Sequence, residues 1–455
     1  MKPNCDTANM MNTSASRNSI CSQRCRRSGV LLVLALALLL AATAARAGSL
    51  ADVFSSGELA GLQMEPLGDA FANTVASTYP VASASSSVTY VYNPKLEAFE
   101  RQAGVLGPIV GERAETIGQG QLNVGFSFSW VDLSTINGDN LGNLENRARI
   151  GSQTVSFPVP GGAQRCGDPR LNPDCSFEKS LFTSFLPVHV FANIDVEAEI
   201  GTPSITYGVT PDLDVNLTVP LMKTSLGVRI AEDVPDPRLP DFKLRICKPD
   251  APEGDPSRCA PDEKPSSVTP GRINRAAFAR ATGFGDVLLR GKYVLLRGAP
   301  FDLAAGLGVS FPSGDKDNFQ GTGTYRVQPT LIASRVIAER FQPLLNLGVD
   351  INADDVGRSI FRWAVGATGQ IVGPLSGAVV FLGRNEFSAQ SDQIAAPFFF
   401  QIERNDMYDA SVGVRMLFAE SGVVSANVIV PLNRDGLRAD YIPTLGVEYA
   451  FSAPW

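Results

Sequence analysis

The chain contains one histidine, His189, and a histidine beside a carboxylate is a common general base. By strand-like alternation, the side chains on the same predicted face are Asn193, Asp195, Glu197 and Glu199. Asp195 lies six residues along the chain, about 20 Å away on an extended strand, which is too far for a hydrogen bond to the imidazole. A catalytic pair would need a carboxylate from another strand. We therefore expect no catalytic residue and no enzyme activity.

Two further groups of residues could bind ions or phosphate. Asp315, Asp317 and Asn318 offer the oxygen ligands that calcium prefers. Their spacing is incomplete for an EF-hand, and the same residue types form ordinary turns. The glycines in 283–285 and 321–323 make loops too short to cradle a phosphate, and no helix pattern follows them. We expect no metal site and no cofactor.

The elements that would position these side chains are strands with one apolar face. In residues 437–451 every second residue is apolar or aromatic, and the interleaved residues are mostly polar or small. Alternation over this length suits a tilted strand that crosses a bilayer, and Trp455 ends the chain in the apolar phase. A strand of a soluble β-sandwich is the alternative. The pattern favours an all-β fold, a closed antiparallel transmembrane β-barrel.

About twelve strands of this kind follow one another from residue 122 onward. They are predicted at 122–130, 188–200, 213–219, 284–297, 300–312, 324–337, 341–352, 359–372, 375–388, 407–418, 422–432 and 437–451. Short connections alternate with long ones, such as 313–323 and 389–406, and a long loop is expected at about 231–281. Short turns on one side and long loops on the other are typical of outer-membrane barrels. One misjudged hairpin would give ten or fourteen strands.

The start of the chain predicts export to the bacterial outer membrane. Three arginines, Arg24, Arg26 and Arg27, precede the apolar run 30–40, and a small-x-small site ends at Ala47. We expect residues 1–47 to be a signal peptide that is cleaved after Ala47. Its removal takes away six basic residues and one acidic residue, so 33 basic residues face 45 acidic ones and the net charge is −12. Such an acidic chain has no electrostatic footprint for nucleic acid.

Past the signal peptide, two regions differ in pattern. Residues 48–118 lack the barrel alternation and are predicted to be an N-terminal extension or a plug of the lumen, whereas residues 119–455 form the barrel. At the junction of the two regions, the glycines and charges of 107–122 are typical of a surface connector. No apolar run after Ala47 reaches the length of a spanning helix, so a membrane protein of this sequence must be a barrel.

Three segments resemble recurring segments of one bacterial family. They are YGVTPDLDVNLTVPL at 207–221, GFGDVLLRGKY at 283–293 followed by GVSFPSGD at 308–315, and VSANVIVPLNRDGLRAD at 424–440. Their order is similar to that of the outer-membrane family labelled "putative MetA-pathway of phenol degradation", and GPIVGERAETIG at 107–118 resembles the N-terminal extension of some members. The resemblance runs from about residue 79 to the end, apart from two cysteine-containing loops. It implies a link to the uptake of aromatic compounds and assigns no functional residue.

Alternation also predicts a lumen that carries charges of both signs, among them Asp214, Asp350, Asp409 and Lys292. The lumen-lining candidates are His189, Asp195, Glu197, Asp286, Arg290, Arg326, Arg362, Arg384, Arg415, Arg438 and Glu448. We expect a channel for passive uptake of small, rather apolar molecules, with aromatic compounds as the class that the resemblance implies. The alternative is a non-transporting structural or binding barrel that acts through long extracellular disulfide loops. The expected partners are outer-membrane lipid and a small-molecule solute.

Four cysteines remain after the signal peptide, and they are predicted to form the disulfides Cys166–Cys175 and Cys247–Cys259. No histidine lies nearby, and the spacings are not those of zinc sites. Each bridge closes a short loop and should stabilise the fold by about 2–3 kcal/mol through loop entropy. Peptide mapping without reduction should recover both pairs. A crossed pairing is the alternative connectivity, and free thiols at all four positions would contradict the prediction.

Overall fold

The computed structural model describes residues 49–54, 75, 90–93, 98–101, 105–146, 189–234, 246–247, 259–260, 271–298, 300–388, 406–418 and 421–453. The predicted signal peptide, Cys166 and Cys175 lie outside the described residues. For His189, Cys247 and Cys259 the backbone alone is described.

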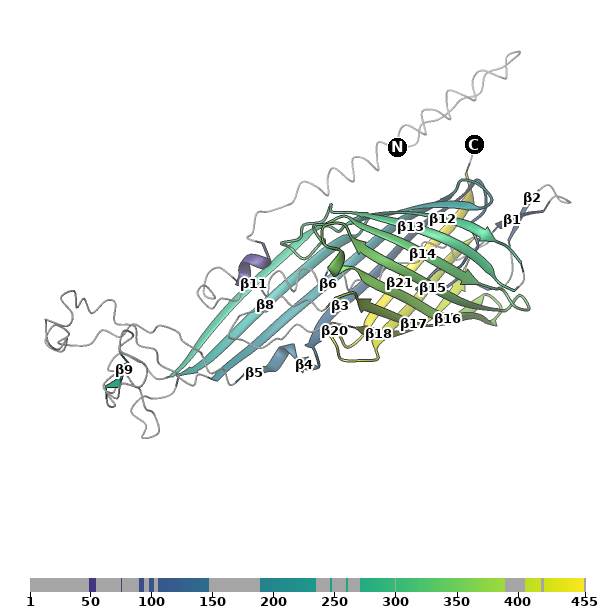
Figure 1. Cartoon of the computed structure of the whole chain (residues 1–455). Coiled ribbons are helices and arrows are strands. Elements are labelled where there is room, and N and C mark those ends of the chain that lie inside the picture. Colours follow the sequence, from purple (N-terminus) through teal and green to yellow (C-terminus); the bar gives the residue numbers. More distant parts are fainter. Residues whose placement is uncertain are drawn as a thin grey trace, which may run out of the picture. The chain divides into compact units, whose positions relative to one another are not determined.

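The described chain is built almost entirely of antiparallel strands (Figure 1). The barrel strands are β3 (Gln121–Ile136), β6 (His189–Gly208), β7 (Leu213–Thr218), β8 (Leu221–Val234), β11 (Gly271–Phe284), β12 (Val287–Leu296), β13 (Asp302–Phe311), β14 (Arg326–Ser334), β15 (Phe341–Asn352), β16 (Ile360–Val372), β17 (Leu375–Glu386), β18 (Met407–Leu417), β19 (Gly422–Pro431), β20 (Leu437–Ala439) and β21 (Ile442–Ser452). Smaller elements are the 3-10 turns η2 (Ala51–Phe54), η4 (Leu141–Asn143) and η7 (Val356–Arg358), and the short strands β1 (Tyr90–Asn93), β2 (Ala98–Arg101), β4 (Asp139–Asn140), β5 (Leu144–Asn146), β9 (Ile246–Cys247) and β10 (Cys259–Ala260). No described helix is long and apolar enough to cross a membrane.

The barrel closes between its first and last strands. β3 pairs with β21 from Thr444 opposite Ser129 to Ser452 opposite Gln121, and it pairs with β6 on its other edge. Three strands of the wall are interrupted. One consists of β7 and β8, one of β11 and β12, and one of β20 and β21. Counted in this way, the wall is the predicted closed barrel of twelve strands. Both ends of the wall thus lie on the side of the short connections 209–212, 297–301, 335–340, 373–374 and 418–421.

Two boundaries differ from the prediction because strands continue past the apolar alternation. The second cysteine-containing loop was expected at about 231–281, but β8 runs to Val234 and β11 begins at Gly271, paired residue by residue. Likewise β6 extends to Gly208, well beyond residue 200. These strands reach farther along the barrel axis than their neighbours (Figure 1).

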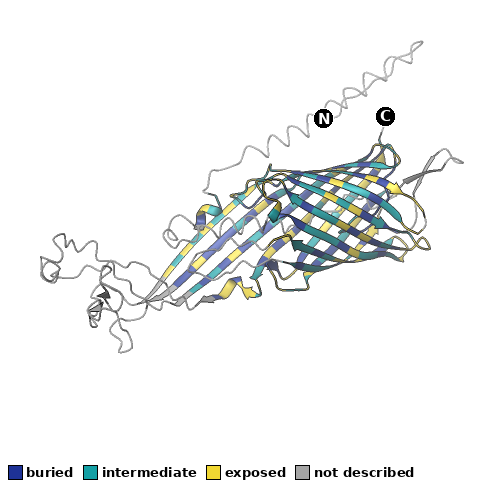
Figure 2. Ribbon diagram, in the orientation of Figure 1, coloured by how far each residue is buried: buried dark blue, intermediate teal, exposed yellow. Residues whose placement is uncertain are grey.

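Large apolar side chains cover the outer face of the barrel. Buried and exposed residues alternate along each strand (Figure 2), and the exposed apolar set includes Phe126, Leu307, Leu345, Val379, Phe381, Val412 and Leu445. Aromatic residues such as Tyr293, Tyr325, Phe341 and Tyr441 are also about half-exposed. A closed wall with an apolar exterior satisfies the backbone in lipid and needs no polar contact outside, as a membrane-spanning barrel requires.

In the first part of β6, toward the long loops, the alternation has the opposite sense. Ile194 and Val196 are buried in an apolar cluster inside the barrel, while Asp195 is exposed and Glu197 is partly exposed. Thr206, on the same side as the buried residues, hydrogen-bonds a lumen side chain, which fixes the inward direction. Asp195 and Glu197 therefore lie on the outer face, and the prediction that they line the lumen is wrong. Where a strand rises out of the bilayer, water contacts the outer face and apolar side chains turn inward.

The connection 312–325 between β13 and β14 folds inward and closes this apolar cluster. Phe319 at its centre is fully buried despite a positive φ of 60°. The cluster also contains Leu50, whose amide donates to Asn318 Oδ1 at 3.1 Å. Asp315 accepts from the backbone amides of Asp317 and Asn318, so the candidate calcium residues form a turn. Asp286 accepts from Gly314 N and Thr322 N and fastens this connection to β12.

The direction of the wall residues can be tested with a charge on the outer face. Val412 lies mid-strand in β18 and is 48% exposed. Val412→Arg should lower the free energy of unfolding in lipid vesicles by about 2–4 kcal/mol, because an arginine at the bilayer midplane loses its hydration. Val412→Leu is the matched control and should keep the parent stability in guanidinium titrations. Equal stability of the two variants would contradict the assigned outer face.

Candidate functional site in the barrel lumen

A stretch of chain without strand pairing lies inside the barrel. We call Val105–Gly120 the crossing segment; every residue from Val105 to Gly118 is buried or partly buried. This corrects the expectation that 107–122 is a surface connector. Its partners include Asp214 near the start of β7, Ser334 at the end of β14 and Gln342 near the start of β15. All of these strand ends meet short connections, so the crossing segment lies at the short-turn end of the lumen.

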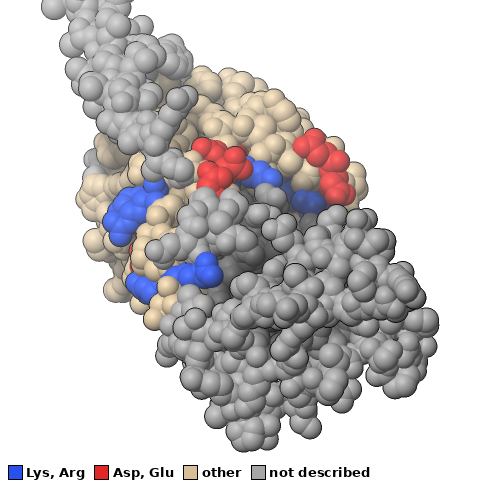
Figure 3. Space-filling model, turned by 90° about the vertical axis from the view of Figure 1, so that its left-hand side faces the viewer, with Lys and Arg blue, Asp and Glu red and all other residues tan. Residues whose placement is uncertain are grey.

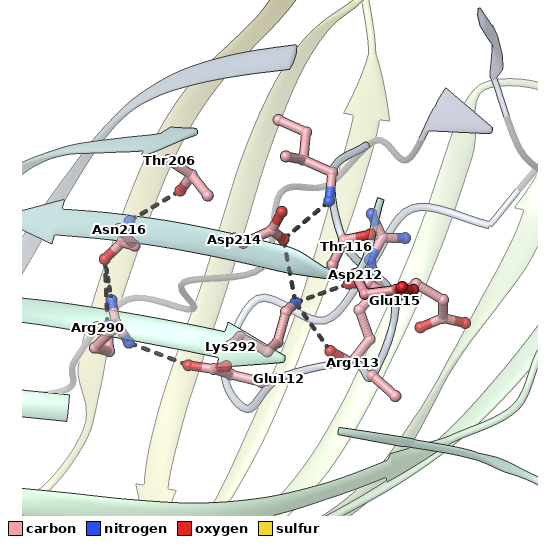
Figure 4. Close-up of polar contacts among 12 residues, drawn as sticks. Glu112, Arg113, Glu115, Thr116, Thr206, Asp212, Asp214, Asn216, Arg290 and Lys292 are labelled. Atoms are coloured by element: carbon pink, nitrogen blue, oxygen red, sulfur yellow. Dashed lines mark hydrogen bonds and ion pairs between the residues drawn. The ribbon is translucent and has the colours of Figure 1, made fainter. Parts of the chain in front are cut away.

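One side of the crossing segment is held by a buried lysine and aspartate (Figure 4). The side chain of Lys292 is 5% exposed, and its Nζ donates to the backbone carbonyls of Arg113 at 3.2 Å and Glu115 at 2.7 Å. Asp214 Oδ2 accepts from Ile117 N at 2.9 Å and lies 3.8 Å from Lys292 Nζ. The charged pair thus satisfies donors and acceptors of the same stretch of backbone, which otherwise has no strand partner.

Next to this pair, Arg290 links the wall to a side chain of the crossing segment. Its guanidinium donates to Glu112 Oε1 at 3.2 Å and to Asn216 Oδ1 at 3.0 Å. Asn216 in turn donates to Thr206 Oγ1 at 2.9 Å (Figure 4). A chain of polar contacts therefore runs from β6 through β7 and β12 to the crossing segment.

A nearby part of the wall, formed by β14 and β15, provides neutral partners. Asn346 bonds both backbone groups of Glu112, accepting from its amide at 2.7 Å and donating to its carbonyl at 2.8 Å. Glu115 accepts from Ser334 Oγ at 3.0 Å and from Gln342 Nε2 at 2.7 Å. These bonds, together with those of Lys292, fix the segment between β12 and β15.

Farther round the wall, Arg415 of β18 holds the start of the crossing segment. Its guanidinium donates to Gly107 O at 2.8 Å and pairs with Glu448 of β21 at 3.2 Å. At the other end, Gly208 allows the closest approach, because a Cβ there would overlap the carbonyl of Gly118. The crossing segment therefore contacts the wall on several sides of the short-turn end.

Beyond the crossing segment, toward the long loops, the lumen contains a cavity of about 220 Å³. Its charged lining consists of Arg362, Arg384, Arg438 and Asp409, and its aliphatic lining of Val110, Ala364, Leu382, Ile429, Ala439 and Ile442. On the described surface at one end of the molecule, groups of acidic side chains lie next to groups of basic ones (Figure 3).

The arginines of this region are only partly balanced by acids. Asp350, 1% exposed, pairs with both Arg326 at 2.7 Å and Arg362 at 2.8 Å. Arg438 pairs with Asp409 at 3.2 Å and donates to Tyr408 O at 2.7 Å. These contacts lie inside the barrel, where low exposure strengthens electrostatic interactions.

The predicted lumen candidates thus fall into four groups. Arg290, Arg415 and Glu448 contact or support the crossing segment. Arg362, Arg384 and Arg438 line the cavity, and Arg326 is joined to Arg362 through Asp350. Asp286 holds the connection 312–325, and Asp195 and Glu197 are outside. His189 is the first residue of β6, opposite Asp233 in the backbone register. Cys247 and Cys259 are directly opposite in the β9–β10 pairing, which is compatible with the predicted bridge. Both disulfides stay predictions.

Glu112 and Glu115, which contact the wall from the crossing segment, were absent from the residues that the sequence placed in the lumen. Glu112, Glu115, Asp214 and Lys292 contribute the contacts to the crossing segment, and Asp409 and Asp350 order the arginines. The useful signal was available in 107–122, where acids, a base and glycines alternate with apolar residues. A segment that must bury itself among polar side chains needs such a mixed composition.

A closed antiparallel barrel with an apolar exterior and a polar, occupied lumen defines an outer-membrane-type β-barrel protein. The chain belongs to the family described as "Putative MetA-pathway of phenol degradation", whose pattern matches residues 189–427. A comparison with curated proteins found no match.

Solved structures of outer-membrane barrels are similar to this chain at low identity. An outer membrane channel from Pseudomonas putida F1 is 12% identical, with 74% of this chain and 98% of that chain covered and a TM-score of 0.43. The CymD monoaromatic hydrocarbon channel is 8% identical, with 74% and 89% covered and a TM-score of 0.31. A Pseudomonas aeruginosa FadL homologue is 10% identical, with 73% and 90% covered and a TM-score of 0.30.

The contacts of Lys292 predict that it controls how firmly the crossing segment is held. Lys292→Met removes two charge-assisted hydrogen bonds, each of about 1.5–3 kcal/mol. Hydrogen exchange of the amides in 112–118 should accelerate by about tenfold or more. Lys223→Met is the matched control, since Lys223 pairs with Glu199 away from the crossing segment and half of its side chain is exposed. Unchanged exchange in Lys292→Met would refute the assigned role.

Proposed function

We propose that this protein is a passive channel of the bacterial outer membrane for small, rather apolar molecules, and that the crossing segment is its plug. The observation that carries the proposal is the lumen itself. A cavity lies inside the wall, and Val105–Gly120 separates it from the short-turn end through side-chain contacts. The side-chain contacts of the crossing segment can break one at a time, whereas the hydrogen bonds between paired strands break together.

The size of the barrel fits such a role. Twelve strands enclose more space than an eight-stranded barrel, whose interior side chains fill, and less than a porin. A bore of this width is readily closed by one segment of chain. The short-turn side of bacterial outer-membrane barrels faces the periplasm, so we place the plug at the periplasmic end.

Relatives suggest the class of molecule. The family description refers to phenol degradation, and one of the similar structures is named a monoaromatic hydrocarbon channel. We therefore propose aromatic compounds as the solute class. We propose no enzymatic activity, because the acids and bases of the lumen are engaged in holding the plug and in ordering the arginines around the cavity.

Conductance tests the plug directly. The mature chain, its Lys292→Met variant and a version lacking residues 48–118 are reconstituted in planar bilayers and in liposomes, after a heat-dependent gel shift has verified folding. We expect low conductance from the mature chain, more frequent openings in Lys292→Met, and steady conductance after the deletion. Lys223→Met should behave like the parent protein.

Uptake separates a channel from a structural barrel. Liposomes with the intact protein should accumulate labelled phenol faster than protein-free liposomes, and the Lys292→Met variant should be faster still. Folded protein that gives neither conductance nor uptake in any of the three versions would reject the proposal. That result would favour a structural or binding role for the long loops.

A further inference from the structure

Two arginines face each other in the wall of the cavity. Arg362 of β16 and Arg384 of β17 are direct cross-strand partners, and both lie on the lumen side. Like charges directly opposite each other in a sheet are destabilising. Such an arrangement inside a barrel costs stability, so its presence calls for a compensating negative charge.

The acids that border the cavity compensate only part of this charge. Three arginines line it, Arg362, Arg384 and Arg438, against one lining acid, Asp409. Asp350, just behind the lining, is shared between Arg362 and Arg326. Glu386, two residues after Arg384, interacts with it electrostatically. The lining and these neighbours together hold four arginines and three acids, an excess of one positive charge.

The arginines also retain donors. Within the described part of the chain, Arg438 Nε and Arg362 Nε are buried atoms without a hydrogen-bond partner. Arg438 as a whole is only 5% exposed, although it lines the cavity. These two Nε atoms are enclosed and lie out of reach of a molecule in the cavity, but the side chains of Arg362, Arg384 and Arg438 line it. A carboxylate can accept two N–H donors of one guanidinium group at once.

The rest of the lining is mostly apolar, with Trp363 beside the aliphatic side chains and with Thr330 and Asn346 as polar members. Leu382, Ile429 and Ile442 line the cavity together with Val110 of the crossing segment. The volume of about 220 Å³ lies below the roughly 300–1,000 Å³ of pockets for drug-sized ligands, so the space suits a single-ring or short-chain molecule. An apolar wall gives little to a small hydrated anion such as phosphate, but it favours a hydrocarbon body.

We propose that this cavity binds a small molecule with an apolar body and one carboxylate, such as an aromatic acid, with the carboxylate held by Arg362, Arg384 and Arg438. The inference rests on the proposed function for the route by which the molecule arrives, and it narrows the solute class from apolar molecules to organic anions. Binding itself requires no flux and can be measured separately.

The test is calorimetric titration of the detergent-solubilised mature protein at neutral pH with benzoate, benzamide and acetate. Benzamide has the shape of benzoate without its charge, and acetate has the carboxylate without the ring. Benzoate should bind about tenfold or more tightly than either one. Equal affinity for benzoate and benzamide would overturn the role of the arginines. Acetate that binds as tightly as benzoate would overturn the apolar subsite.

Two variants locate the carboxylate. Arg362→Gln leaves Asp350 paired with Arg326 at 2.7 Å, so the fold should tolerate it, and Arg384→Gln removes the opposing charge. Each should weaken benzoate binding about tenfold and leave benzamide unchanged. Arg297→Gln is the control, because Arg297 pairs with Asp212 at a short turn outside the cavity. Parent-like benzoate affinity in both cavity variants would refute the proposal.

The two proposals can fail separately. A protein that conducts and takes up phenol but binds benzoate no better than benzamide retains the proposed function and loses this inference. A protein that binds benzoate through the arginines but shows no conductance or uptake in any version retains the site and loses the channel.

Discussion

The interior of this barrel depends on the need to satisfy backbone groups that have no strand to pair with. A segment inside the lumen buries its amides and carbonyls, and each one left without a partner costs free energy. Wall side chains meet that need here. Lys292 serves two carbonyls, Asp214 one amide, and Asn346 both groups of Glu112. Many of the polar residues on the lumen side of β7, β12 and β15 therefore bind the crossing segment, in addition to lining a polar lumen.

The architecture could be predicted from the sequence because alternation locates the strands, and their count came to about twelve. It does not fix which face points inward. In lipid the apolar face points out, and in water it points in, so the same pattern has opposite meanings at two heights of one strand. β6 crosses both environments, and Asp195 was for that reason assigned to the wrong face. Strands that do not extend beyond the bilayer, such as β16 to β18, have the same face inward along their whole length.

The site was only partly predictable for a different reason. Arg362, Arg384 and Arg438 could each be placed on the inner face, but their convergence follows from the register of β16 with β17 and from the position of β20, which alternation does not specify. The crossing segment depends on still longer separations. Ile117 and Asp214 are 97 residues apart, and Gly107 and Arg415 are 308 apart. Local composition could show that 107–122 was unusual, but not that its partners surround it.

The position of the crossing segment also constrains the order in which the barrel can assemble. Gly120 leads directly into Gln121, the residue of β3 that pairs with Ser452 at the seam between the first and last strands. The segment joins the wall at this seam, which leaves two possible orders of assembly. Either the segment occupies the interior before β3 and β21 pair, or it enters afterwards through the short-turn end. In the first order, the sheet closes around the crossing segment. The polar contacts of Lys292 and Asn346 with this segment would then bring distant strands together before β3 pairs with β21.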